Sequence, residues 1–136
     1  ITILLPGVLS IKSLHPYEYV YYNNFVGGID GAFRQFEMDY WGTSINEATG
    51  FINQNALENA RILVAGPYQN VQYYARNDLE IFDIEKVNNA SFEDYDYAIL
   101  LTRDNADLKY MPASTTLFQV KRGDAVYVVV REITRE

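Results

Sequence analysis

Two short stretches near the start of the chain gather residue types that could bind a sugar. The first is HPYEYVYYNNFVGG, residues 15–28, and the second is FEMDYWG, residues 36–42. Aromatic rings can stack on the C–H faces of sugars, while carboxylates and amides can bind the hydroxyl groups. The substrate-binding candidates are His15, Tyr17, Tyr19, Asn23, Glu37, Asp39, Tyr40 and Trp41. The alternative is that these side chains only pack and hydrogen-bond within the protein.

Catalytic chemistry has less support in these stretches. Glu37 and Asp39 are two residues apart, so they could serve glycoside hydrolysis or simply supply a cap and a hydrogen bond. His15 is the only histidine and the chain has no cysteine, which leaves few residues for a metal site or an acid–base relay. No nucleophile-elbow pattern is present. We therefore expect no catalytic residue, no metal site and no cofactor in this chain.

Composition indicates a single globular domain and excludes some partners. The 136 residues suffice for one domain with its own core, and 49% of them are hydrophobic. The formal net charge of −7 argues against nucleic acid as a partner, because a phosphate backbone demands a basic surface. Twelve tyrosines suit half-buried surfaces, such as a carbohydrate or protein interface.

The elements that must position the candidates are weakly marked up to residue 43 and clearer beyond it. Aromatic and β-branched residues predict a short strand over 17–22, a glycine cluster predicts a turn or helix entry over 27–31, and a short helix is expected over 32–39. Ser44 and Glu47 have the spacing of a capping box. An apolar stripe after them predicts a helix over 44–56.

The rest of the chain alternates apolar strands with helical segments. VAGPYQN, residues 64–70, has the strand–turn–helix pattern at which open α/β sheets bind ligands, but its one glycine is too few for a dinucleotide fold. Strands are expected over 62–65, 79–84, 97–102, 117–121 and 125–133, and a helix over 67–77. A turn or a single helical turn is expected over 91–95, and a loop over 103–115. The pattern predicts an α/β layered sandwich with a mixed, mainly parallel central sheet, flanking helices and a C-terminal β-hairpin.

The two aromatic stretches also carry a family resemblance. They resemble the C-terminal region of polytopic membrane glycosyltransferases of the GT-C type, which are related to protein mannosyltransferases and use lipid-linked sugar donors. The matching residues are His15, Pro16, Tyr17, Tyr19, Tyr21 and Asn23 in the first motif, and Glu37, Asp39, Tyr40, Trp41 and Gly42 in the second. The specific similarity covers residues 14 to about 52.

The resemblance implies a role in transferring sugar from a polyprenyl-phosphate carrier. Residues 1–14 would be the tail end of a membrane-proximal segment, and 15–136 a single soluble domain on the extracytoplasmic side of the membrane. Its partners would be the membrane-embedded remainder of the polypeptide and a sugar or glycan acceptor. The family's catalytic acidic residue lies in an early loop that this chain lacks, so the domain would be accessory. The alternative is a free-standing carbohydrate-binding or adaptor module without transferase activity.

Overall fold

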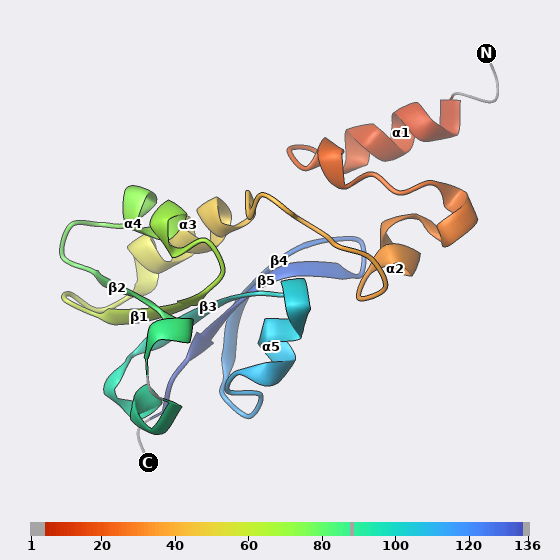
Figure 1. The fold of residues 1–136 in the computed structure, drawn as a ribbon. Coiled ribbons are helices and arrows are strands. Elements are labelled where there is room, and N and C mark those ends of the chain that lie inside the picture. The colour runs from red at the N-terminus through yellow and green to blue at the C-terminus, as the bar shows by residue number, and fades with distance from the viewer. Residues whose placement is uncertain (1–4, 88, 135–136) are drawn as a thin grey trace.

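The protein is built around one five-stranded mixed sheet with helices on both faces. The computed structural model describes residues 5–87 and 89–134 (Figure 1). The strands are β1 (Arg61–Ala65), β2 (Glu80–Asp83), β3 (Tyr97–Leu101), β4 (Thr116–Arg122) and β5 (Ala125–Glu132). Their order in the sheet is β2-β1-β3-β5-β4, with β1 parallel to both neighbours and β5 antiparallel to both of its own. The predicted α/β class and the C-terminal hairpin are thereby confirmed.

The central strands are apolar on both faces because both faces are covered. Every residue of β3 is buried, as expected for a strand whose two sides face protein. Side chains alternate between the two faces of a strand, so Ile99 and Leu101 join one cluster of core side chains while Ala98 and Leu100 join the other. The continuous apolar run in the sequence therefore reports two cores separated by one sheet.

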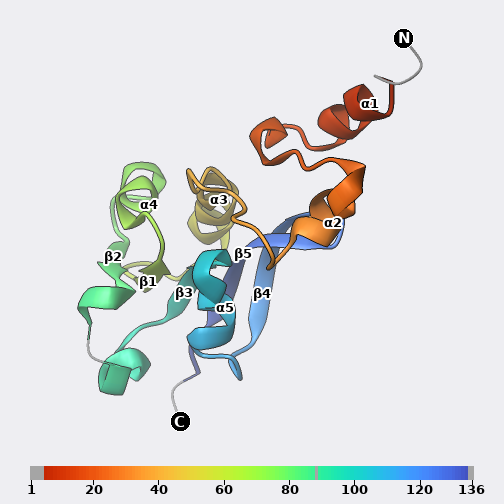
Figure 2. The ribbon, with the colours of Figure 1, turned by 45° about the vertical axis from the view of Figure 1, so that its right-hand side comes forward.

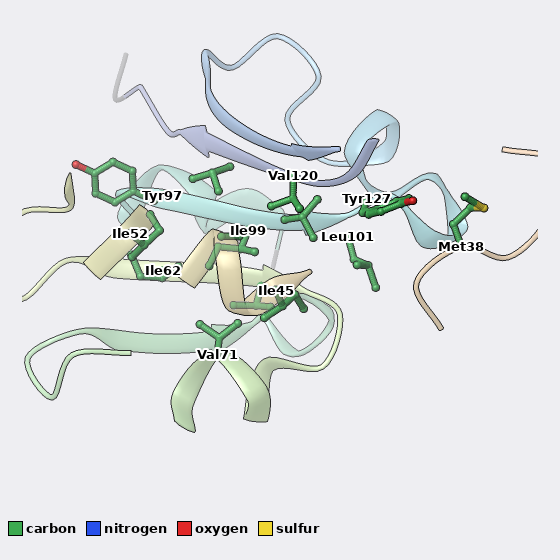
Figure 3. Close-up of a cluster of buried hydrophobic side chains, with 14 of the residues drawn as sticks. Met38, Ile45, Ile52, Ile62, Val71, Tyr97, Ile99, Leu101, Val120 and Tyr127 are labelled. Atoms are coloured by element: carbon green, nitrogen blue, oxygen red, sulfur yellow. The ribbon is translucent and has the colours of Figure 1, made fainter. Parts of the chain in front are cut away.

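Two helices cover the first face of the sheet. They are α3 (Ile45–Asn55) and α4 (Tyr68–Tyr74). Ile45, Ile52 and Val71 have almost no exposed surface and lie against Ile62 and other strand side chains (Figure 3). Burying an aliphatic side chain of this size contributes roughly 1.5–3 kcal/mol. These contacts hold α3 and α4 beside each other on the sheet (Figure 2).

Shorter segments cover the second face. They are the 3₁₀ turns η3 (Ile84–Lys86), η4 (Asn89–Asp94) and η5 (Arg103–Asn105), and the short helix α5 (Ala106–Lys109). Ile84 and Ala106 supply apolar contacts there. Residues 103–115 are thus partly helical, where the sequence predicted a loop. A turn or a single helical turn was expected over 91–95, and the structure has the 3₁₀ turn η4 over Asn89–Asp94.

The N-terminal region consists of short helical segments, and its first helix lies apart from the sheet. The segments are α1 (Leu5–Ser13), η1 (Glu18–Val20), η2 (Asn24–Val26) and α2 (Gly28–Ala32). Tyr17, Val20 and Met38 attach the region to the first core, whereas α1 points away from it (Figures 1 and 2). Within the described residues, no helix has the length and apolar content needed to cross a membrane.

Three local predictions near the candidates are wrong. The segment 17–22 contains the 3₁₀ turn η1 (Glu18–Val20) and forms no strand. Residues 32–39 do not form a helix, because α2 ends at Ala32 and the backbone is left-handed at Arg34 and Asp39. The capping box does not form either. Ser44 makes no side-chain cap, and Glu47 accepts a hydrogen bond from Tyr17 instead. The helix predicted over 44–56 is confirmed as α3.

Candidate functional site

The main cleft of the protein lies where the three parallel strands end. It has a volume of about 650 Å³, and its lining includes Ala65 and Gly66 after β1, Asp83 at the end of β2 and Leu101 at the end of β3. The chain leaves β1 through α4 to reach β2, while β3 lies on the opposite side of β1. Such a reversal of strand order opens a crevice at the carboxyl ends of the strands, which is the usual ligand site of open α/β sheets.

Two aromatic side chains from the N-terminal region border this cleft. Tyr40 and Trp41 both line it, with ring centroids 5.0 Å apart and planes at 88°. Trp41 is 70% exposed, so most of its ring is available to a ligand. Because a large exposed ring at a cleft is costly to leave in water, it is a natural contact surface.

A tight turn presents the two rings. The N–H of Gly42 donates to the carbonyl of Asp39 at 2.8 Å, with a left-handed backbone at both residues. The carboxylate of Asp39 accepts hydrogen bonds from the N–H groups of Thr43 and Ser44, at 2.9 and 3.0 Å. These N–H groups lie just before α3, where no helix carbonyl can accept from them, so Asp39 connects the turn to the start of that helix.

Arg103 fastens the aromatic turn to the end of β3. Its guanidinium lies over the Tyr40 ring, 4.9 Å from the centroid, and its Nη1 donates to the Tyr40 carbonyl at 3.4 Å. Its Nε lies 2.6 Å from Oε1 of Glu37. The turn therefore contacts both α3 and the strand ends, which holds the rings at the cleft without a large local core.

The charges around the cleft balance. The cationic side chains of the lining are Lys86, Arg103 and Lys109, and the anionic ones are Asp83, Glu85 and Asp104. The Nζ of Lys86 lies 3.1 Å from Oδ2 of Asp83, and this bond raises the pKa of Lys86. The lining therefore has no net charge that would attract a phosphate or a nucleotide from a distance. Within residues 5–87 and 89–134, no group of three or more His, Asp or Glu side chains could hold a metal ion.

Of the eight candidates chosen from the sequence, two lie in the lining of the cleft and six lie outside it. Tyr40 and Trp41 line the cleft, and Glu37 borders an adjoining hollow of about 390 Å³ that shares Arg103 with it. Asp39 lies below the turn with 1% of its surface exposed. Tyr19 is half-exposed and donates its hydroxyl to Asp39. Burial and this bond raise the pKa of Tyr19.

Like Glu37, Asp39 and Tyr19, the remaining three candidates lie outside the lining of the cleft, and they contact protein groups. Tyr17 is buried; its hydroxyl donates to Oε1 of Glu47 at 2.5 Å, and its pKa is raised chiefly by burial. The Nδ1 of His15 lies 2.6 Å from Oε1 of Glu18. The side chain of Asn23 accepts a hydrogen bond from the N–H of Phe25 and so caps η2. Sugar binding by these residues stays a prediction.

Sequence reasoning missed the residues that the strand ends bring to the cleft. Tyr68 and Asn70 belong to the VAGPYQN segment, which the sequence singled out as a ligand position without naming its side chains. Lys86 and Arg103 follow β2 and β3 by a few residues. Since parallel strands present their carboxyl ends at one edge of a sheet, residues just after each predicted strand were the available signal.

Comparison with known proteins adds no relative. No protein-family model, no curated protein sequence and no solved structure matches the chain. The geometry of the cleft and the motifs in residues 15–42 are therefore the features from which a function can be inferred.

Proposed function

We propose that this chain is the accessory C-terminal domain of a membrane glycosyltransferase, and that it binds a glycan in the main cleft. In this proposal the parent protein transfers a sugar from a polyprenyl-phosphate carrier, and catalysis takes place in its membrane-embedded remainder. The observation that carries the glycan-binding part is the exposed Trp41 ring, held beside Tyr40 on a rigid turn at the cleft.

The chemistry of the cleft suits a neutral sugar. The π face of an aromatic ring is negative, so it attracts the weakly positive C–H groups on one face of a sugar ring. The hydroxyl groups around that ring need donors and acceptors, which Gln69, Asn70 and the carboxylates of the lining can supply. A charge-balanced lining exerts no net attraction on a phosphate. We therefore favour a neutral glycan, such as the acceptor or a sugar already attached to it.

The exposed apolar side chains of α1 support attachment to the rest of such a protein. Val8 and Leu9 are about 60% exposed, and Ile11 is 40% exposed. This helix lies away from the sheet (Figure 1), and these three side chains are exposed to solvent. We propose that residues 1–14 end a membrane-proximal segment, and that the domain lies on the extracytoplasmic side of the membrane.

The glycan-binding part can be tested with Trp41→Ala in the 136-residue chain. Titration of the ¹⁵N-labelled protein with neutral mannose oligosaccharides should perturb amides around the cleft, and the substitution should weaken binding about tenfold. Phe25→Ala is the matched control, because Phe25 is a fully exposed ring that does not line the cleft. Binding by Trp41→Ala as tight as by the unaltered chain would exclude the cleft as the glycan site.

The transferase part has separate tests. The gene upstream of this segment should encode several hydrophobic spans; a reading frame without them would favour the free-standing binding module. An accessory domain should also show no transfer from a polyprenyl-phosphate-linked sugar by itself. Transferase activity in the isolated 136 residues would contradict the accessory role.

A further inference from the structure

A smaller hollow, different from the one beside Glu37, adjoins the main cleft at Trp41; we call it the outer hollow. It has a volume of about 230 Å³ and is lined by Trp41, Gly42, Thr43, Asn46, Asn70, Tyr73 and Tyr74. Trp41 and Asn70 line both this outer hollow and the main cleft. They therefore lie between the two, and one ligand could contact them from either side.

The outer hollow repeats the aromatic arrangement of the cleft. Tyr73 and Tyr74 form a pair with centroids 5.0 Å apart and planes at 88°, the same geometry as Tyr40 and Trp41. Tyr73 is 82% exposed. Val71 is fully buried against the sheet and fixes the orientation of α4, while a hydrogen bond from Asn53 to the Tyr74 carbonyl at 2.8 Å ties its end to α3. The exposed rings thus stand on a fixed support.

The polar groups of this hollow are uncharged and available. No ionised side chain lines it. In the part of the chain that the structure describes, the side-chain amides of Asn46 and Asn70 make no hydrogen bond to another protein group. Each amide offers two donors and an acceptor, which matches the mixed donor and acceptor character of sugar hydroxyls. The hollow beside Glu37 is less suitable for a neutral sugar, because its lining includes four charged side chains, Arg34, Glu37, Arg103 and Asp104.

We propose that the ligand is a linear neutral oligosaccharide that spans the main cleft and the outer hollow. This inference rests on the proposed glycan-binding function and specifies its substrate class. One or two sugar units would occupy the main cleft, whose volume lies in the usual range for small-ligand sites of about 300–1,000 Å³. A further unit would lie in the outer hollow on the Tyr73 ring, with Asn46 and Asn70 bound to its hydroxyl groups. The wall formed by Trp41 would contact both parts of the chain.

The test compares sugars of increasing length on one protein. The probes are mannose, mannobiose and mannotriose, with glucose, maltose and maltotriose as a second series, titrated into the ¹⁵N-labelled 136-residue chain. In at least one series the trisaccharide should bind about tenfold more tightly than the monosaccharide, because it adds ring and hydroxyl contacts in the outer hollow. The amides of Tyr73 and Tyr74, which line the outer hollow and not the main cleft, should shift only with the longer sugars.

Tyr73→Ala should remove this gain. The trisaccharide should then bind about as weakly as the monosaccharide, whose own affinity should not change; Tyr73→Phe keeps the ring and should restore most of the gain. The large exposure of Tyr73 makes both variants compatible with folding. If monosaccharide and trisaccharide bind the unaltered chain equally, or Tyr73→Ala weakens both alike, the two-hollow inference is wrong while glycan binding stands. If no sugar of either series binds, the proposed glycan-binding function itself is wrong.

Discussion

Replacing Asp39 with alanine is expected to destabilise the fold, because a buried set of donors would lose its acceptor. The Asp39 carboxylate accepts from the N–H groups of Thr43 and Ser44, from the Ser44 hydroxyl and from the Tyr19 hydroxyl. Ser44 has no exposed surface, so its two donors cannot turn to water. Thr43 and Tyr19 are exposed enough to be solvated.

The size of the expected loss of stability in Asp39→Ala follows from these contacts. A buried donor left without an acceptor costs about 1–3 kcal/mol, and loss of a group that caps the start of a helix costs about 0.5–2 kcal/mol. The two costs overlap at Ser44, since its N–H is counted in both. We expect the free energy of unfolding to fall by about 2–4 kcal/mol. For a chain of this length, the Tm should fall on the order of 10 °C.

Thermal and urea unfolding followed by circular dichroism would measure the effect. Asp39→Asn should lower the free energy of unfolding by about half as much as Asp39→Ala. Asparagine keeps one acceptor oxygen and tolerates the left-handed backbone at this position (φ 48°). Ser44→Ala removes one of the orphaned donors, so the double variant should be more stable than the sum of the single effects predicts. A Tm of Asp39→Ala within about 3 °C of the unaltered chain would refute the reasoning. If that variant instead stayed stable and lost glycan binding, Asp39 would be a ligand contact.

Two further predictions concern a pair of buried tyrosines and an ion pair. Tyr127 is buried and its hydroxyl has no hydrogen-bond partner within the described residues, so Tyr127→Phe should leave the free energy of unfolding unchanged or raise it by up to about 1 kcal/mol. Tyr17→Phe removes the hydrogen bond to Glu47 and should lower the free energy of unfolding by about 1 kcal/mol. Urea unfolding measures both changes, and changes of the same sign in the two variants would contradict this prediction. The Arg76 side chain, 3.0 Å from Asp78, lowers the pKa of Asp78 from 3.8 to about 2. The unfolded chain then binds the proton more readily, so this stabilisation is complete above about pH 4 and is lost as the pH falls toward 2. Asp78→Asn should be less stable than the unaltered chain at pH 7 and match it near pH 2, and a difference that persists at pH 2 would argue against the ion pair.

Periodic patterns in the sequence predicted the sheet and its helices well. The alternation of helical stripes and apolar runs located α3, β1, β3 and the hairpin of β4 and β5, and it predicted the α/β class. These elements bury most of their apolar side chains, so the spacing of apolar residues along the sequence predicts which face of each element is buried. An entirely apolar strand such as β3 can exist only with both faces covered.

The N-terminal region was predicted poorly because distant partners determine its backbone. Ser44 and Glu47 have capping-box spacing, yet Asp39 binds Ser44, and Tyr17 binds Glu47 from 30 residues away. Arg34 takes a left-handed backbone where its guanidinium reaches Asp107 at 2.6 Å. Local propensities carry no information about such partners, so short polar segments of this kind follow tertiary contacts.

The sequence by itself determined which residue types are available for a ligand and which partners the charge disfavours. It marked Tyr40 and Trp41 as candidate ring contacts and VAGPYQN as a ligand position, but it placed them in separate segments. Only the tertiary structure brought them to one cleft, because the end of β1, the end of β3 and the turn after Asp39 meet at the same edge of the sheet. It also separated neighbours that the sequence grouped: Asp39 turns inward to support α3, while Trp41 two residues later faces solvent. Side-chain direction in an irregular turn depends on the backbone dihedrals that the surrounding contacts impose, and no local spacing encodes them.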